Sequence, residues 1–334
     1  MKLEVGVRTD PGRRKEANED NYGVYLPGDS GLPNLKDGGL LVVADGLGGH
    51  FAGDVASKLA VTIMKDFLTA ERGESNNPLK LLSETAQKAN LQIHNANRGL
   101  KGHFKPMGTT LTAVFVEGDR AYFCHVGDSR AYLIRGDHIQ LVTEDHSWVG
   151  EQVKMGLMTR EKAFCDPRRH VLTHTLGTRP EAYVDTYERE IRQGDILACC
   201  TDGLSNTVSA KEILSICSEA ENAQEAAEKL VREANERGAP DNVTVIVVAV
   251  EPERIKLASK KFRQSAKRAL KTAAKTVLLL AVIIGAFLLG HYAGQRNMLQ
   301  SIQADLENPV LSEPVYPYPE DMEPDSNFES AVDE

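Results

Sequence analysis

The aspartates of this chain recur in short, turn-like segments at the ends of apolar, strand-like runs. The segments are Asn18-Glu19-Asp20, Asp45-Gly46, Gly127-Asp128-Ser129, Thr201-Asp202-Gly203 and Pro240-Asp241-Asn242. Any one of them could be only a turn, because aspartate caps its own backbone and glycine tolerates a positive φ. If they converge at one edge of the sheets, the carboxylates would repel one another unless divalent cations neutralised them. Oxygen ligands without a Cys or His cluster favour Mg²⁺ or Mn²⁺ over Zn²⁺.

The elements that must position these aspartates are strands with helices between them. Alternating and β-branched apolar runs predict strands at residues 39–44, 110–117, 120–126, 131–135, 196–200 and 243–250. Helical periodicity predicts helices at residues 53–68, at 78–97 and within 210–237, where two helices fit. Residues 144–178 are polar and irregular. Because strands and helices do not alternate one by one, the pattern indicates an α+β fold of sheets covered by helices.

Several segments, in a fixed order along the chain, carry a more specific resemblance. They are Asp45-Gly46-Leu47-Gly48-Gly49-His50, Met107-Gly108-Thr109-Thr110, Gly127-Asp128-Ser129-Arg130-Ala131-Tyr132, Asp202-Gly203-Leu204 and Asp241-Asn242-Val243-Thr244. Together they resemble the signature set of the bacterial metal-dependent protein phosphatases, the PPM family of type 2C Ser/Thr phosphatases. The resemblance runs from about residue 3 to about residue 250.

The resemblance implies the fold and the activity of residues 1–250. The expected fold is a four-layer α/β/β/α sandwich, in which two antiparallel sheets are flanked by helices. The expected reaction is hydrolysis of phosphoserine and phosphothreonine in proteins at a site of two Mn²⁺ or Mg²⁺ ions bridged by a water. Residues 144–178 fall where the family has a mobile flap beside the site, which is expected to influence substrate choice.

The family's ligand roles can be placed on matching positions of this chain. Asp20 and Asp45 would hold the two ions, and Gly46 would lend its carbonyl oxygen. The shell of the second ion would be completed by Asp202 and Asp241. A third, weaker ion would bind at Asp128.

The position of the phosphate-binding arginine departs from the family pattern. The family places an arginine, which grips the substrate phosphate, five residues before Asp20, and Lys15 stands there instead, preceded by Arg13 and Arg14. Lysine supplies charge without the bidentate fork of arginine. Either Lys15 binds the phosphate more weakly, or a neighbouring arginine, Arg14 or Arg13, takes over after a small shift.

Three other functions compete with this interpretation. Cys124 and Arg130 have the C-x5-R spacing of cysteine-dependent phosphatases, but that chemistry needs a helix after the loop, and residues 131–135 read as a strand. A catalytically silent phosphoprotein-binding module remains open because of Lys15, although every expected aspartate is present. A metal-dependent nuclease, like nucleic-acid binding in general, is disfavoured by the net charge of −9, because phosphates need a basic face.

The composition changes after residue 250. Residues 251–275 are basic, and residues 276–294 form an apolar stretch that, at about 1.5 Å per residue, just crosses the hydrocarbon of a bilayer. Residues 295–334 are acidic and too polar to bury a core, so we expect a disordered tail. Basic flanks stay on the cytoplasmic side. These patterns predict a single-pass protein of the cell inner membrane, with the catalytic domain in the cytoplasm and the tail outside.

The expected partners follow from the same features. They are phosphorylated proteins and the Ser/Thr kinases that the enzyme would oppose. Ala286, Gly290 and Gly294 recur every four residues in the predicted span, so two spans could approach closely and form a homodimer. The five cysteines include no C-x-x-C pair, which is typical of proteins in a reducing compartment.

Overall fold

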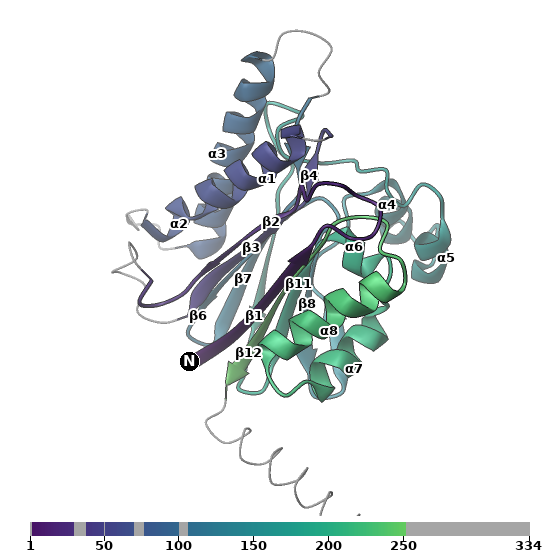
Figure 1. The fold of residues 1–334 in the computed structure, drawn as a ribbon. Helices are drawn as coiled ribbons and strands as arrows, with labels where there is room; N and C mark the ends of the chain where they lie inside the picture. The colour runs from purple at the N-terminus through teal and green to yellow at the C-terminus, as the bar shows by residue number, and fades with distance from the viewer. Residues whose placement is uncertain (1, 30–37, 50, 70–76, 100–105, 252–334) are drawn as a thin grey trace, which may run out of the picture. The chain divides into compact units, whose positions relative to one another are not determined.

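The computed structural model describes residues 2–29, 38–49, 51–69, 77–99 and 106–251. Two five-stranded antiparallel sheets form its centre (Figure 1). Across the first sheet the order is β1 (Lys2–Asp10), β12 (Val243–Glu251), β11 (Ile196–Cys200), β8 (Arg130–Arg135) and β9 (His138–Leu141). Across the second it is β10 (Asp185–Glu190), β7 (Arg120–Val126), β6 (Leu111–Glu117), β3 (Gly39–Ala44) and β2 (Asn21–Tyr25). A short third sheet pairs β4 (Gly46–Leu47) with β5 (Gly108–Thr109).

Helices cover the outer face of each large sheet (Figure 1). The second sheet is covered by α1 (Phe51–Met64), α2 (Asp66–Thr69) and α3 (Pro78–Gly99). The first sheet is covered by α7 (Ala210–Glu219) and α8 (Ala223–Glu236). Three shorter helices are α4 (Trp148–Lys154), α5 (Arg160–Cys165) and α6 (Asp202–Ser205).

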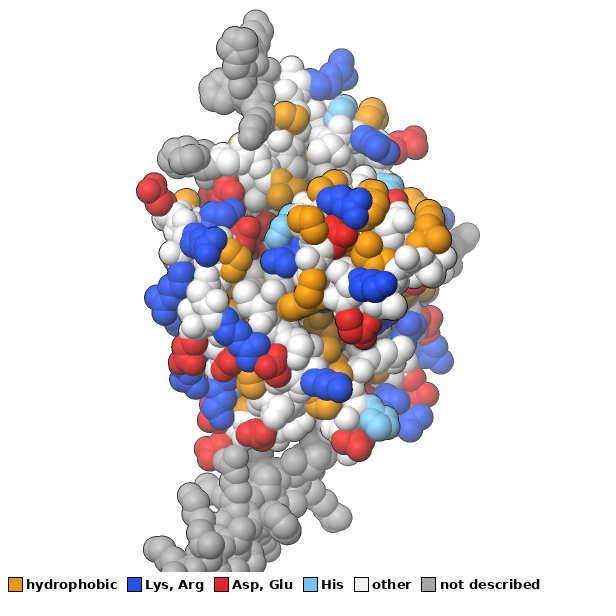
Figure 2. All heavy atoms as spheres, turned by 90° about the vertical axis from the view of Figure 1, so that its right-hand side faces the viewer, with side chains coloured by type: hydrophobic (Ala, Val, Ile, Leu, Met, Phe, Trp, Pro, Cys, Tyr) orange, Lys and Arg blue, Asp and Glu red, His pale blue; other side chains and the backbone are white. Residues whose placement is uncertain are grey.

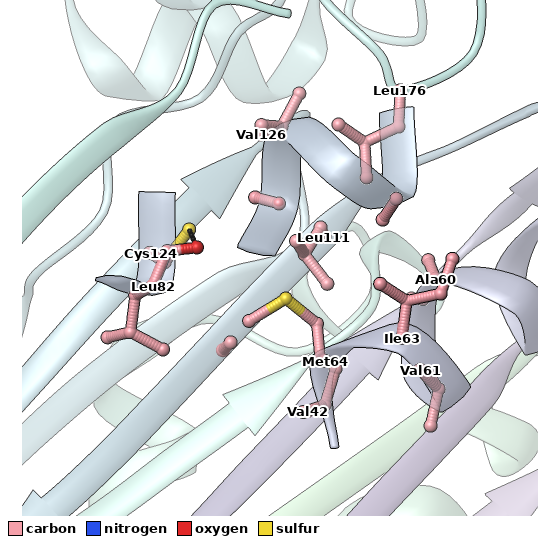
Figure 3. Packing of buried hydrophobic residues seen from close by; sticks show 14 of the residues in the cluster. Val42, Ala60, Val61, Ile63, Met64, Leu82, Leu111, Cys124, Val126 and Leu176 are labelled. Carbon is pink, nitrogen blue, oxygen red and sulfur yellow. Dashed lines mark hydrogen bonds between the residues drawn. The ribbon is translucent and has the colours of Figure 1, made fainter. Parts of the chain in front are cut away.

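The core has three layers of apolar side chains, because each sheet is buried on both faces. Strand β3 shows this best, since all six of its residues are buried. Leu41 and Val43 face the other sheet, while Leu40 and Val42 face the helices. A strand buried on both faces needs an uninterrupted apolar run instead of alternation. Figure 3 shows the helix-side layer, where Met64 of α1 packs near the sheet residues.

The predicted four-layer sandwich is confirmed, and every strand predicted from an apolar run is present. Strands β2, β9 and β10 were not predicted. All three lie at sheet edges, where side chains are partly exposed and the apolar pattern is weak. The predicted helix at 53–68 is two helices, α1 and α2, and the segment 210–237 holds two helices as expected.

The prediction that residues 144–178 are irregular is wrong in part, because the segment contains α4 and α5. Each helix begins at a side-chain cap: the Ser147 hydroxyl accepts from the Gly150 amide, and the Thr159 hydroxyl accepts from the Lys162 amide. Such caps offset the low intrinsic stability of short helices. We keep the name flap for residues 144–178.

The membrane predictions concern residues that lie outside the described part of the chain. None of the helices in the described ranges is long and apolar enough to cross a membrane. The predicted span at 276–294, the tail at 295–334 and nearly all of the basic stretch at 251–275 fall in residues 252–334, beyond those ranges.

The pairing of the first and last strands decides where the aspartates meet. β1 runs antiparallel to β12, with Thr9 opposite Thr244 and Asp10 opposite Val243. The loop that follows β1 therefore starts beside the segment that precedes β12. This pairing brings Asp20 near Asp241, although more than two hundred residues separate them in the sequence.

Candidate metal centre

Asp20 lies at the centre of the cluster, directly before β2. Its side chain is 6% exposed, and its Oδ2 accepts hydrogen bonds from the hydroxyls of Thr201 at 2.8 Å and Thr244 at 2.7 Å. Burial raises the pKa of Asp20 to about 7, and the charges of Asp202 and Asp241 add to this effect, while the two hydroxyls oppose it. The carboxyl is therefore held in place but disfavoured as a bare anion.

The loop that carries Asp20 is fixed by one amide side chain at the start of the last strand. Asn242 donates from Nδ2 to the carbonyls of Pro11 and Ala17, both at 2.9 Å. Its Oδ1 accepts from the backbone N–H of Glu19, also at 2.9 Å. Asn242 is itself buried. The pair Asp241-Asn242 thus combines a candidate ligand with the residue that positions another.

Asp45 follows β3, and its backbone is pinned on both sides. Its N–H donates to the Thr110 hydroxyl and its carbonyl accepts from the Thr110 N–H, both at 2.9 Å. The Thr109 hydroxyl donates to the same carbonyl at 2.9 Å. At Gly46 an added Cβ would lie 2.3 Å from the Gly53 carbonyl oxygen, so only glycine lets the start of α1 approach this turn.

The pKa of Asp45 shows that its neighbours in space are the other aspartates. Burial raises this pKa well above its ordinary value, and the charges of Asp20, Asp202 and Asp128 raise it further. Burial also raises the pKa of Asp128, and the charges of Asp202 and Asp145 contribute after it. The charges of these aspartates therefore raise the pKa values within the cluster.

Asp202 and Asp241 complete the cluster. Asp202 opens α6, where its Oδ2 accepts from Nδ2 of Asn206 at 2.9 Å. Asp241 lies two residues before β12 begins, and its charge contributes to the raised pKa of both Asp20 and Asp45. The structure thus brings all five predicted aspartates together.

Two carboxylate oxygens of the cluster are suited to bind cations, because they are buried and lack hydrogen-bond partners in the described part of the chain. Oδ1 of Asp20 and Oδ1 of Asp202 are buried, and neither has a hydrogen-bond partner among the described residues. A buried carboxylate oxygen without a partner is costly unless a cation compensates it. No three His, Cys, Asp or Glu side chains in the described ranges form a ready-made ligand set for one ion. The fit therefore rests on the mutual repulsion of the carboxylates and on their unpartnered oxygens, because like charges do not gather unaided.

Lys15 reaches the cluster, as the sequence predicted for a phosphate-binding residue. Its Nζ lies 2.7 Å from Oδ1 of Asp241. Burial lowers the pKa of Lys15, but Asp241, Asp45 and Glu19 outweigh it, and the net shift is upward. Arg13 instead donates from Nε to the Asn235 carbonyl at 3.5 Å, and its backbone N–H donates to the Ala239 carbonyl at 2.9 Å, so its side chain lies at the end of α8.

The family model described as Protein phosphatase 2C matches residues 15–237. The chain belongs to the protein phosphatase 2C family. Among its relatives, the serine/threonine phosphatase stp of Listeria innocua is 37% identical over 256 residues, which cover 74% of this chain and 95% of the relative. The protein phosphatase PhpP of Streptococcus pneumoniae is 32% identical, over 75% of this chain and 99% of the relative.

Solved structures of family members match the same region. The serine/threonine phosphatase PstP/Ppp of Mycobacterium tuberculosis is 34% identical, with a TM-score of 0.65, over 75% of this chain and 99% of that chain. The catalytic domain of the serine/threonine protein phosphatase PstP, solved in complex with two manganese ions, is 34% identical, with a TM-score of 0.62 and the same coverage. The match leaves about a quarter of this chain without a counterpart in these structures.

The flap is anchored beside Asp128 by a histidine that sequence reasoning missed. The backbone N–H of His146 donates to the Gly127 carbonyl at 2.7 Å, and Nδ1 of His146 accepts from the Gly127 N–H at 3.2 Å. Because Nδ1 is an acceptor, Nε2 carries the proton and donates to Oδ2 of Asp185 at 3.1 Å. The His146 carbonyl accepts from the Thr173 N–H at 2.9 Å, which closes the base of the flap.

Other positioning residues were also missed, although some left a signal. Thr244 is the lone hydroxyl within the apolar run of β12, and polar residues inside such runs need a buried partner. Thr201 directly precedes a predicted ligand. Arg130 grips Asp145 through two nitrogens, with its shortest contact at 2.6 Å, and only the structure reveals that pair.

The structure excludes the cysteine mechanism. Cys124 is buried in β7, where its thiol points to the Leu82 carbonyl of α3 at 3.8 Å (Figure 3). Burial raises the pKa of this thiol to about 12, so the reactive thiolate is absent at neutral pH. Arg130 opens the strand β8, and no helix follows Cys124 to stabilise a thiolate.

Proposed function

We propose that the chain hydrolyses phosphoserine and phosphothreonine in proteins at the aspartate cluster, with Mn²⁺ or Mg²⁺ as cofactor. The observation that carries the proposal is the burial of mutually repelling carboxylates, two of which have oxygens without hydrogen-bond partners in the described residues. The manganese-bound relative supports this choice of ion. Two ions would be held by Asp20, Asp45, the Gly46 carbonyl, Asp202 and Asp241. A third, weaker ion would bind at Asp128.

When bound, two such ions lower the pKa of a shared water and neutralise charge on the transferring phosphoryl group. The chain's own contribution is preorganisation. The hydroxyls of Thr201 and Thr244 both donate to Oδ2 of Asp20, whereas Oδ1 has no hydrogen-bond partner among the described residues and could contact a cation. The contacts of Thr110 fix Asp45 before any ligand arrives. Fixed groups of this kind need no reorganisation during the reaction.

We assign the substrate phosphate to Lys15 in place of the family's arginine. Its ammonium already lies at the cluster, beside Asp241, whereas Arg13 is tied to the end of α8. A single point charge holds a phosphate without the geometric fork of arginine. A Lys15→Arg variant should therefore lower the KM for a phosphopeptide, and a Lys15→Ala variant should raise it.

The decisive experiment measures phosphate release from a phosphothreonine peptide by the purified full-length chain, with Mn²⁺ or with EDTA. Turnover should require the metal. Asp45→Asn should lower kcat/KM by at least about a hundredfold, because even residues that only orient metal ligands matter by about ten- to a hundredfold. Cys124→Ala serves as the matched control and should retain turnover. Turnover in EDTA, or an active Asp45→Asn, would contradict the proposal.

The silent binding module gives a different result in the same assay. A folded chain that binds the phosphopeptide but releases no phosphate with any divalent cation would favour it. No contact in the described residues favours the silent module, because Lys15 and all five aspartates lie together at one site.

The proposal includes a membrane anchor and opposing kinases. The basic residues at 251–275, the apolar stretch at 276–294 and the acidic residues at 295–334 support a single pass through the inner membrane, with the phosphatase domain in the cytoplasm. Substrates would be proteins phosphorylated by Ser/Thr kinases, and the span would allow a homodimer. The full chain should stay with membranes after alkaline carbonate extraction, and deletion of residues 276–294 should release it. Release of the full chain would contradict the anchor.

A further inference from the structure

A cavity of about 530 Å³ lies between the flap and the first sheet, and we call it the flap cavity. Asp128 and Asp202, both members of the aspartate cluster, line it. Its volume falls in the range of about 300–1,000 Å³ that is common for ligand sites. Figure 2 looks onto the side of the molecule that carries α4 and α5, where hydrophobic and basic side chains gather together.

Apolar side chains from three elements line the flap cavity. Val149 and Val153 lie one turn apart on α4 and therefore share a face of that helix. Phe164 comes from α5. Ile139 and Leu141 come from β9, at the edge of the first sheet. Both flap helices thus direct apolar groups to a space beside the reaction centre.

The charged groups that line the cavity are of both signs, and four of the nine form two ion pairs with each other. Arg130 is held by Asp145 with a shortest contact of 2.6 Å. Nζ of Lys154 lies 2.7 Å from a carboxylate oxygen of Glu144. Paired charges attract a further charged ligand weakly, because their fields largely cancel. An apolar occupant therefore matches the part of the lining that α4, α5 and β9 provide.

We propose that the flap cavity binds a large apolar side chain of the phosphoprotein substrate, close in sequence to the phosphorylated serine or threonine. This inference rests on the proposed function. The cavity shares Asp128 and Asp202 with the reaction centre, so a polypeptide that delivers its phosphate there has residues close to the cavity. An extended chain advances about 3.3–3.6 Å per residue, and a cavity of this volume is roughly 8 Å across. The apolar residue should therefore lie within about two or three residues of the phosphorylated one.

The first test uses the unmodified full-length chain with Mn²⁺ and a set of phosphothreonine peptides. Leucine or phenylalanine replaces alanine at each position up to three residues before and after the phosphothreonine. At one of these positions the apolar residue should raise kcat/KM by about tenfold or more, which is the discrimination that a hydrophobic pocket gives between side chains of different size. Para-nitrophenyl phosphate, which has no peptide, reports the chemistry alone.

The second test places a charge in the cavity. Val153→Glu should reduce the preference, measured as the ratio of kcat/KM for the leucine and alanine peptides, to about one, because a carboxylate in the cavity disfavours an apolar group beside it. Leu157→Glu is the matched control. Leu157 also belongs to the flap, but it is 72% exposed and does not line the cavity. The peptide preference of the Leu157→Glu variant should therefore match that of the unmodified chain. Phe164→Ala, a milder change, should reduce the ratio partly.

The outcomes separate this inference from the proposed function. A preference that Val153→Glu or Phe164→Ala diminishes and Leu157→Glu preserves would support the apolar substrate pocket. Turnover of para-nitrophenyl phosphate without any preference among the peptides would overturn the pocket alone. A preference that survives in both cavity variants would also overturn it. No turnover of any substrate would overturn the proposed function, and the pocket with it.

Discussion

Without a bound metal, Asp20 should lower the stability of the folded protein as the pH rises. Burial and the charges of Asp202 and Asp241 raise the pKa of Asp20 from 3.8 to about 7. Between these two values the folded protein keeps a proton that the unfolded chain has released, so rising pH favours the unfolded chain. The penalty is absent below the unfolded pKa and complete above the folded one.

The magnitude follows from the two pKa values. Each pH unit between them is worth about 1.4 kcal/mol, so the difference between 3.8 and about 7 corresponds to roughly 4 kcal/mol. About 2.5 kcal/mol of this loss falls between about pH 5 and about pH 8. Since about 1 kcal/mol changes the Tm of a domain of this size by about 2–4 °C, we expect an effect of about 5–10 °C.

One buried histidine acts in the opposite direction and determines how the assay must be designed. Burial, with the charge of His146, lowers the pKa of His125 to about 4. The folded protein therefore binds fewer protons there than the unfolded chain does, and stability rises with pH up to the unfolded pKa near 6.5. The Tm of the unmodified chain alone would show the sum of both effects. The quantity to measure is its Tm minus that of Asp20→Asn.

The assay follows thermal unfolding by circular dichroism in EDTA, from about pH 5 to about pH 8. The Tm of the unmodified chain should fall relative to Asp20→Asn by about 5–10 °C over this range. Asp137→Asn is the control, because the Asp137 side chain is 93% exposed, and its profile should run parallel to that of the unmodified chain. Saturating Mn²⁺ should raise the Tm of the unmodified chain most strongly near pH 8. Parallel profiles for the unmodified chain and Asp20→Asn would refute the reasoning.

Two further predictions concern single contacts. Thr244→Val removes the hydroxyl that lies 2.7 Å from Asp20. Since a hydrogen bond to a charged group contributes about 1.5–3 kcal/mol, half-maximal activity of this variant should need about tenfold more Mn²⁺. An unchanged Mn²⁺ titration would show that this hydroxyl does not position the carboxylate. Gly6→Ala places a Cβ 2.2 Å from the backbone of Ala223, so β1 and α8 must separate, and the Tm should fall by at least about 5 °C. Gly99→Ala is the control: a Cβ there has no atom within 4 Å, so the Tm should stay unchanged. Equal Tm values for the two glycine variants would contradict that packing.

The sequence was most informative where a strand is buried on both faces. Runs such as Leu40-Leu41-Val42-Val43 can satisfy their apolar side chains only between two layers, so the central strands and the covered sheets were predictable. The edge strands β2, β9 and β10 were not predicted because most of their side chains are partly or fully exposed, which weakens the apolar pattern. The flap helices escaped for a related reason, since short capped helices leave little periodicity.

The sequence by itself determined which residues could hold a cation, because Asp-Gly and Asp-Asn turns at strand ends are local features. It did not determine which hydroxyls and amides hold them. Thr201, Thr244 and Asn242 reach Asp20 and its loop only because β12 pairs with both β1 and β11. Likewise, the flap cavity exists only where α4 and α5 fold over β9. Such contacts depend on the pairing of strands far apart in the chain, and only the tertiary structure decides that pairing.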